Sequence, residues 1–160
     1  MAEALGQITW LLSQSPLHSQ LSIKALEQSF MPPIIKEQFR IFRFGPLPGG
    51  DVPANFQAAG LSKSQIEEMP LGVAIWAHLS EAAERKLETR EPLELEEWDS
   101  GDRTWLVELI TPYATPDNRL TEMMLADLAA GPFADKPFKL HRTDTSGQRE
   151  AITVDQHLRA

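Results

Sequence analysis

Hydrophobic residues recur every three or four positions at the start of the chain, over residues 2–13. This spacing predicts an amphipathic helix. The apolar positions are Ala4, Leu5, Ile8, Leu11 and Leu12. Ser15-Pro16 follows, and because the residue before a proline avoids helical angles, we expect the helix to end there. Ser15 is then placed to cap a short turn with Pro16 at its first position, and His18 lies on that turn.

Several later segments have the patterns of strands and helices. Strands are predicted where apolar residues alternate with polar ones or form short runs bounded by turn residues. These segments are 38–44, 72–78, 104–111, and a final pair around 138–140 and 152–154 that flanks a turn at Ser146-Gly147. Helices are predicted at 22–30, which Pro32-Pro33 should end, at 62–69, at 80–88 with Ser80 as its cap, and at 118–130 capped by Asp117 or Asn118. Mixed strands and helices with one sheet predict the α+β or α/β class.

A long segment rich in glycine and proline, residues 45–70, separates the first two predicted strands. Such punctuation marks a loop, and a connection of this length inside a compact domain is usually functional. We interpret it as a loop insertion that contains the short helix at 62–69. The length of 160 residues otherwise suits a single domain over 1–160.

Composition excludes several classes of function. The chain has 15 basic and 23 acidic residues, a formal charge of −8, which disfavours binding to nucleic acid or to an anionic membrane. It contains no cysteine, so disulfides and thiolate chemistry are excluded, and no pair of histidines has the spacing of metal ligands. We find no signal peptide and no apolar run long enough to span a bilayer, so we expect a cytoplasmic protein.

His18 is the first candidate for chemistry, because an imidazole with an unperturbed pKa of about 6.5 suits a general base at neutral pH. Glu108 is the second, since it interrupts the apolar run Trp105-Leu-Val-Glu-Leu-Ile. Each has a structural alternative. A lone histidine is commonly a hydrogen-bonded turn residue, and strand alternation would point Glu108 to solvent unless it is buried with a partner. Ser15 suits a cap better than a nucleophile, because no Gly-x-Ser-x-Gly elbow surrounds it.

Four motifs in one order carry more specific information. They are Leu5-Gly-x-x-x-Trp10-Leu with Ser15-Pro-Leu-His18, then Pro33-x-x-x-x-Gln38-Phe, then Gly72-Val-Ala-x-x-Trp76-Ala-x-Leu79-Ser, then Trp98-x-Ser-Gly-Asp-Arg-x-Trp105 with Ile110-x-Pro112-Tyr. Together, over most of residues 5–145, they resemble the RTX-toxin-activating lysine acyltransferases, the hemolysin-activating type.

The resemblance implies a single domain with a three-layer, Gcn5-related N-acyltransferase fold, a mixed central sheet flanked by helices. It implies transfer of a fatty acyl group from acyl carrier protein to internal lysines of an RTX protoxin, with no tightly bound cofactor and no metal. The carrier's phosphopantetheine thioester is then a co-substrate, and the carrier and the protoxin are the partners. A homodimer is left open.

The resemblance also implies roles for individual residues. His18 falls on the family's catalytic histidine, Ser15 on the serine before it, and Glu108 where the family typically carries a catalytic aspartate. The candidates for binding the acyl chain, the pantetheine arm or the oxyanion are Leu17, Trp76, Gly101, Asp102, Arg103 and Trp105. The candidates for docking the acidic carrier are Lys36, Arg40, Arg43, Lys86 and Arg103.

Two alternatives to this transferase function stay open. In the first, the chain is a binding module that has lost catalysis and only engages an RTX-like protein or a carrier protein. Whether Glu108 reaches His18 discriminates between this module and the active transferase. The second alternative, transfer from acyl-coenzyme A to a small amine, fits the same fold.

Overall fold

A single five-stranded sheet forms the centre of the molecule, in the order β1-β2-β3-β4-β5. The computed structural model describes residues 1–43, 57–134, 136–143 and 148–155. The strands are β1 Phe39–Arg43, β2 Pro70–Leu79, β3 Arg103–Ile110, β4 Phe138–Thr143 and β5 Arg149–Val154. Neighbouring strands are antiparallel except β3 and β4, which are parallel. The predicted mixed α+β fold with one sheet is therefore confirmed.

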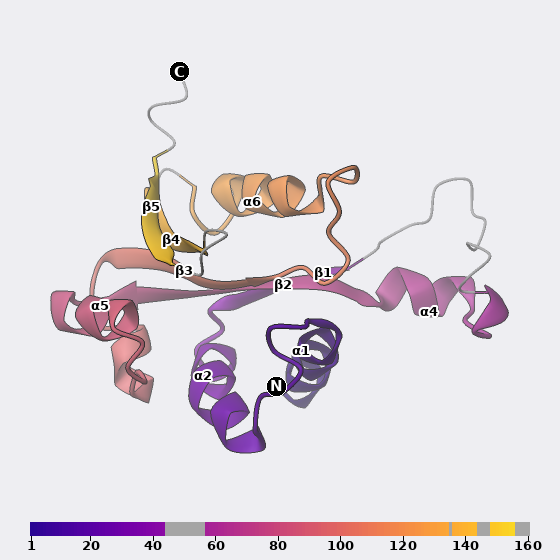
Figure 1. Cartoon of the computed structure of the whole chain (residues 1–160), viewed down its shortest axis with the longest axis horizontal. Helices are drawn as coiled ribbons and strands as arrows, with labels where there is room; N and C mark the ends of the chain where they lie inside the picture. Colours follow the sequence, from indigo (N-terminus) through magenta and orange to yellow (C-terminus); the bar gives the residue numbers. More distant parts are fainter. Residues whose placement is uncertain (44–56, 135, 144–147, 156–160) are drawn as a thin grey trace.

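Helices cover both faces of this sheet (Figure 1). They are α1 Ala2–Gln14, α2 Ile23–Ile35, α4 Lys63–Glu68, α5 Glu81–Glu88, α6 Leu120–Ala130 and the 3-10 helix η2 Leu95–Trp98. Helices α1 and α2 lie on one face of the sheet and α6 lies on the other (Figure 1). Ser22, Ser62 and Ser80 each accept a hydrogen bond from a backbone N–H in the first turn of the helix that follows. Sequence predicted the Ser80 cap and the short helix near 62–69.

Two hydrophobic clusters form the core, one on each face of the sheet. On the α1 and α2 face, Ile8 and Leu11 pack with Ile75 and Trp105. On the other face, Ala74 and Trp76 of β2 and Leu106 of β3 pack with Leu128 of α6, Phe133 after it and Phe138 of β4. Because side chains alternate across a strand, β2 and β3 contribute to both layers.

Helix α2 extends further than predicted. Pro32 and Pro33 were expected to end it, but the helix continues to Ile35 with both prolines buried. A proline lacks the N–H that would bond the carbonyl four residues earlier, so the carbonyls of Gln28 and Ser29 lose their helical donors. Both residues border an open cavity, where solvent can supply donors instead.

The predicted start of the helix at 118–130 differs in detail from the structure. Helix α6 begins after Arg119, which has a positive φ of 52° and gives no side-chain cap. Asn118 lies one residue earlier, and its side-chain oxygen accepts from the N–H of Leu120 at 3.1 Å. Residues 45–56 of the predicted loop at 45–70, and the turn at Ser146-Gly147, lie outside the described residues, whereas the rest of that loop contains the expected short helix as α4. No described helix has the length and apolarity to cross a membrane.

Candidate active site

A β-bulge in strand β3 decides which way Glu108 points. Leu106 pairs with Trp76 and Glu108 pairs with Ile75, so Val107 is an extra residue between two consecutive partners on β2. Directly paired residues share a face of the sheet, and Ile75 lies on the α1 and α2 face. Regular alternation from Trp105 would have placed Glu108 on the opposite face. The bulge therefore moves the carboxylate to the face that carries the first two helices.

His18 reaches this same region from the turn after α1. The carbonyl of Ser15 accepts from the N–H groups of His18 at 3.0 Å and Ser19 at 2.9 Å, which closes the turn. The extended backbone of Ser15 before Pro16 ends the helix, as the sequence predicted. The expected cap takes a different form, because the side chain of Ser15 contacts the imidazole ring.

Ser15, His18 and Glu108 form a continuous line of polar contacts. The Ser15 Oγ lies 2.7 Å from His18 Nδ1, and His18 Nε2 lies 3.3 Å from Glu108 Oε2. The side chain of His18 is 16% exposed and that of Glu108 is 38% exposed, so the carboxylate is the more accessible of the two. The two residues are 90 positions apart in sequence.

The ring of His18 satisfies both neighbours in two protonation states. In the neutral ring, Nε2–H donates to the carboxylate and Nδ1 accepts from the Ser15 hydroxyl. In the imidazolium, both ring nitrogens donate, one to the carboxylate and one to the hydroxyl oxygen. The remaining neutral tautomer, with Nδ1–H bound to Ser15, directs the Nε2 lone pair toward Glu108. A cation that enters between Nε2 and Glu108 would satisfy that tautomer.

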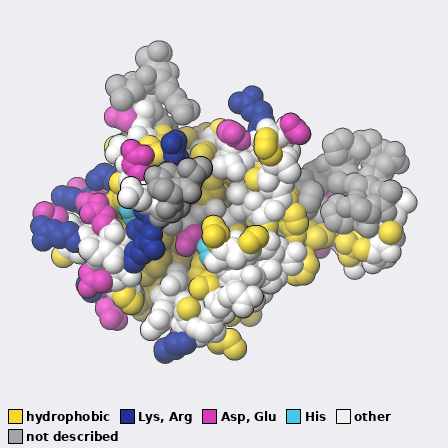
Figure 2. Space-filling model, in the orientation of Figure 1, with side chains coloured by type: hydrophobic (Ala, Val, Ile, Leu, Met, Phe, Trp, Pro, Cys, Tyr) yellow, Lys and Arg dark blue, Asp and Glu magenta, His cyan; other side chains and the backbone are white. Residues whose placement is uncertain are grey.

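His18 and Glu108 border a cavity of about 420 Å³, whereas Ser15 does not line it. Figure 2 shows the corresponding face, with histidine and acidic side chains at the edge of a hollow whose floor is partly hydrophobic. Residues from α2, the α5–η2 connection, β3, β4 and β5 complete the lining. They include Gln28, Ser29, Leu87, Arg90, Glu91, Pro92, Leu93, Trp98, Val107, His141 and Arg149.

The cavity opens where the parallel strands β3 and β4 stop pairing. Their paired residues are Trp105 with Lys139 and Leu106 with Leu140. Val107 and His141, the next residues along each strand, both line the cavity. Unpaired strand edges offer backbone N–H and C=O groups to a bound ligand.

The other predicted binding residues are distributed over several places. Leu17 lines the cavity beside His18. Trp76 packs against Phe133 on the α6 face of the sheet. Gly101 and Asp102 line a separate hollow at the far end of β2 with His78 and Thr104.

Arg103 and Trp105 instead belong to a network around Glu84, whose side chain is 9% exposed. Glu84 accepts from Arg103 Nη1 at 2.6 Å, from the indole Nε1–H of Trp105 at 2.7 Å and from Lys139 Nζ at 3.3 Å. Burial alone would raise the pKa of Glu84, but these hydrogen bonds outweigh it and leave the pKa below its usual value. The network joins α5 to β3 and β4.

Most cations proposed for docking already have partners. Arg40 pairs with Asp127, Lys86 with Glu97, and Arg43 donates to Gln7. Sequence reasoning missed the two arginines that line the cavity, Arg90 and Arg149. No motif singles them out, since their positions depend on a turn after α5 and on the start of β5. Among the described residues, no group of His, Asp and Glu side chains is arranged to hold a metal ion.

A histidine held between a hydroxyl and a carboxylate at the edge of a cavity is the arrangement of a general base. The fold and this site define a mixed α+β protein with a serine–histidine–carboxylate line beside a cavity on one face of its sheet. The sequence profile of the RTX toxin acyltransferase family matches residues 1–56 and 57–156, and the chain belongs to this family.

Individual relatives agree with the family. The leukotoxin-activating lysine-acyltransferase LktC serotype A11 of Mannheimia haemolytica is 31% identical over 111 residues, which cover 68% of this chain and 53% of the relative. The RTX-II toxin-activating lysine-acyltransferase ApxIIC of Actinobacillus pleuropneumoniae is 27% identical over 110 residues, 68% of this chain and 55% of the relative. The protein-lysine palmitoyltransferase CyaC of Bordetella bronchiseptica is 26% identical over 126 residues, 78% of this chain and 56% of the relative. The chain thus spans about half the length of the curated relatives it matches.

Proposed function

We propose that this chain is a protein-lysine acyltransferase that moves a fatty acyl group from acyl carrier protein to internal lysines of an RTX-type protoxin. The observation that carries the proposal is the contact between His18 and Glu108 at the edge of the cavity. Membership of the family and the names of its relatives support the reaction class. We place the reaction in the cytoplasm.

His18 acts as the base for the acceptor amine. A lysine amine has a pKa near 10.4, so at neutral pH it must lose a proton before it attacks a thioester. The entering ammonium donates one hydrogen bond to the Glu108 carboxylate and gives a proton to His18 Nε2. With the ammonium bound to Glu108, the Ser15 hydroxyl accepts from Nδ1–H and leaves the Nε2 lone pair free for the proton. Because Ser15 does not border the cavity, we assign it this positioning role and not that of a nucleophile.

The bond changes balance without a further reactant. The free amine attacks the thioester carbonyl and forms the new C–N bond through a tetrahedral intermediate. His18 releases the first proton, taken from the ammonium, to solvent through the open cavity. The nitrogen of the intermediate still carries one proton more than the amide, and His18 takes this second proton and passes it to the departing thiolate as the C–S bond breaks. The products are an amide on the lysine, the free thiol of the carrier arm and one proton in solvent, and the imidazole is again neutral.

Two features of the sheet support binding of a pantetheine thioester in a Gcn5-related N-acyltransferase arrangement. The amides of an extended pantetheine arm suit the unpaired edges of β3 and β4 beyond Leu106 and Leu140. The bulge at Val107 leaves backbone groups outside the strand ladder. We expect backbone donors at this bulge to stabilise the oxyanion.

The contact between Glu108 and His18 also bears on the competing functions. A binding module without catalysis would have no need for an acid that reaches the histidine, so the contact favours the enzyme. Transfer from acyl-coenzyme A to a small amine uses the same base, and only the choice of donor and acceptor separates it from the proposal.

The test is an acyl-transfer assay read by intact mass. The purified chain would be incubated with acyl carrier protein carrying a long-chain acyl group and with a candidate RTX protoxin. An acyl mass gain on an acceptor lysine is expected, and it should disappear with His18→Ala. His78→Ala is the matched control, because His78 bonds Thr104 outside the cavity. Carrier binding without transfer to several acceptors would instead support the binding module.

A further inference from the structure

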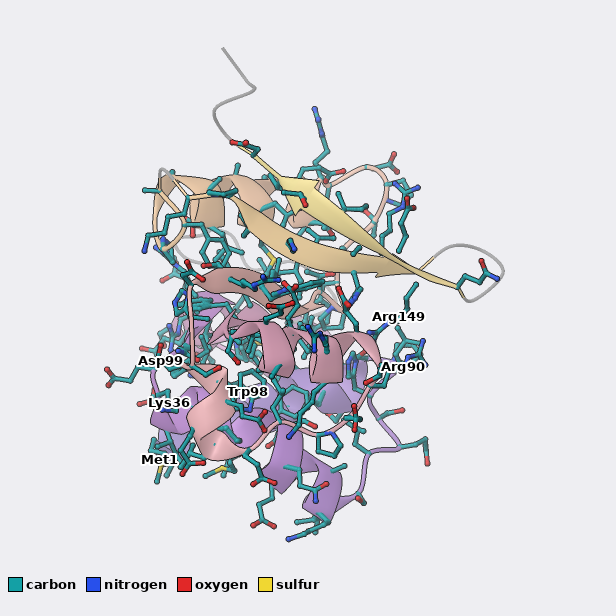
Figure 3. All side chains as sticks on the ribbon, turned by 90° about the vertical axis from the view of Figure 1, so that its left-hand side faces the viewer. Met1, Lys36, Arg90, Trp98, Asp99 and Arg149 are labelled. Atoms are coloured by element: carbon teal, nitrogen blue, oxygen red, sulfur yellow. The ribbon has the colours of Figure 1, made fainter. Side chains whose placement is uncertain are left out.

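Two arginines from distant parts of the chain meet on one wall of the cavity that holds His18 and Glu108. Arg90 follows α5 in a left-handed conformation with φ of 62°. Arg149 begins β5, and its Nη2 donates to the carbonyl of Leu87 at 3.1 Å, near the end of α5. Figure 3 shows both labelled side chains on the same side of the molecule, beside the end of this helix.

Within the described part of the chain, the positive charges of the two guanidinium groups are not balanced by a carboxylate within salt-bridge distance, whereas Arg40, Arg85 and Arg103 each have one. Burial lowers the pKa of Arg149, the charge of Arg90 lowers it further, and Glu108 acts in the opposite direction. Holding like charges together costs free energy, which a bound anion would recover.

The rest of this wall also supplies donors. His141 lines the cavity and stacks on Trp105 with a ring separation of 4.6 Å. Burial, followed by the charges of Arg149 and Arg90, holds the pKa of His141 below its usual value. His141 is therefore a neutral N–H donor near pH 7 and adds no third positive charge.

Trp98 adds a second, independent observation. It lines the cavity, is only 3% exposed, and its indole N–H has no acceptor among the described residues. The two acids on the lining already have partners, because Glu91 accepts from Thr89 and Glu108 contacts His18. The described side chains of the lining thus offer more donors than acceptors, and a ligand rich in acceptor oxygens would complement them.

We propose that Arg90 and Arg149 form the subsite for the phosphate group on the pantetheine arm of the acyl donor. This inference rests on the proposed function. Guanidinium groups bind phosphate with two parallel hydrogen bonds, a geometry that lysine lacks. The donor thioester must lie in the same cavity as His18, and about 420 Å³ suits a small ligand. The acceptor lysine is itself a cation and gains nothing from two guanidinium groups.

The first test measures binding and needs no turnover. Calorimetry of the full chain would compare 4′-phosphopantetheine with pantetheine, which differ only in the phosphate. We expect the phosphate to tighten binding by about tenfold or more, as one charge-assisted hydrogen bond does. Arg90→Gln and Arg149→Gln should each reduce this preference and the double variant should abolish it. Equal binding of the two compounds by the unchanged chain would overturn the proposal.

Control variants distinguish the loss of a positive charge in the cavity from a general loss of folding. Arg142→Gln removes the same charge from the same sheet at an exposed residue that does not line the cavity, and it should keep the phosphate preference. Arg149→Gln also removes the bond to the carbonyl of Leu87, so thermal melting of each variant is recorded. Arg149→Lys keeps a donor and the charge and should retain an intermediate preference. A double variant that folds normally and still prefers the phosphate would contradict the assignment.

The second test measures transfer and distinguishes the sources of the phosphate. Acyl-pantetheine, acyl-phosphopantetheine, acyl-coenzyme A and acyl carrier protein would be compared as donors. All but the first carry the phosphate, so the arginine variants should raise KM for those three only. If the variants raise KM for the acceptor alone, the arginines bind an acidic segment of the acceptor and the proposal is wrong. If no donor supports transfer yet the phosphate preference holds, the proposed function fails and the phosphate site stands.

Discussion

At the scale of single residues, the site depends on one histidine whose two ring nitrogens have different partners. From its residue type and its place after Ser15-Pro16, His18 could be named only as a candidate base, because a lone histidine is commonly a turn residue. It was the resemblance to the family that implied a catalytic role. The partner Glu108 could be named only as a candidate. Alternation along an apolar strand predicts a solvent-facing carboxylate there, and the bulge that reverses this orientation has no signature in the residues themselves.

Replacing Ser15 by alanine removes the 2.7 Å contact to Nδ1 and leaves the rest of the cavity lining unchanged. We expect kcat to fall by about tenfold to a hundredfold, because orientation of the base is lost while binding surfaces remain. KM should change little. The nitrogen-15 shifts of the His18 ring would report the altered tautomer mixture, which a purely structural role of Ser15 would not affect. Wild-type shifts together with normal kcat would remove Ser15 from the mechanism.

Shortening Glu108 to aspartate tests whether the longer side chain is needed. The His18 contact is already 3.3 Å long, and removing one methylene withdraws the carboxylate by roughly 1.5 Å. A displacement of that size lowers kcat by up to about a hundredfold. Steady-state acyl transfer would measure it, with Glu91→Asp as the control acid in the same cavity. Full activity of Glu108→Asp would mean that strand β3 shifts toward the histidine.

At the scale of elements, the carboxylate of Glu84 joins α5 to strands β3 and β4. This network could not be predicted from the sequence. Glu84 lies in a helix full of charged residues, where a solvent-exposed side chain is the ordinary expectation, and its partners are 19 to 55 positions away. The helix itself was predicted, because its Ser80 cap is a local signal.

The Glu84 network should make the free energy of unfolding depend on pH in the acidic range. Its pKa is lower in the folded chain than in the unfolded chain, so its stabilisation is complete above the unfolded value of about 4.3. The stabilisation is lost as pH falls through the lower, folded value. Glu84→Gln should lower the free energy of unfolding by about 2 kcal/mol at pH 7 and flatten its pH dependence below pH 5. Urea unfolding across pH measures both effects, and a variant as pH-sensitive as wild type would assign the acid sensitivity elsewhere.

At the scale of the whole molecule, the sheet separates two packed layers, and the sequence predicted most of this architecture. Apolar runs and caps identified the described strands and α-helices, apart from the extension of α2 through Pro32 and Pro33, while the 3-10 helix η2 was not predicted. The order of strands and the single parallel pair depend on contacts between distant segments, which periodicity does not reveal. The cavity depends on those contacts too, which is why Arg90 and Arg149 were missed.

Close packing between the sheet and α6 makes Gly72 sensitive to substitution. A Cβ at this position would lie 2.6 Å from Met124 Cε and 2.9 Å from the carbonyl oxygen of Ile110. Gly72→Ala should therefore lower the free energy of unfolding by about 1 to 3 kcal/mol. Gly6→Ala is the opposite control, because Gly6 lies inside α1 with nothing within 4 Å of the added Cβ. It should stabilise by about 0.5 to 1 kcal/mol, and chemical denaturation of both variants would show the difference in sign.

The bulge at Val107 decides on which face of the sheet the Glu108 side chain lies. Glu108 faces His18 because one residue more than the partner strand requires stands between Leu106 and Glu108. Point substitutions at Val107 preserve that count, so the orientation tolerates changes of residue type there. Deleting Val107 would leave Leu106 opposite Trp76 and Glu108 opposite Ile75, so the carboxylate would stay on the α1 and α2 face. A regular strand that keeps Val107 without the bulge would instead turn Glu108 toward α6 and bring Leu109 to the face of His18. A relative could therefore keep His18, Val107 and Glu108 in an alignment and still hold its acid away from the histidine.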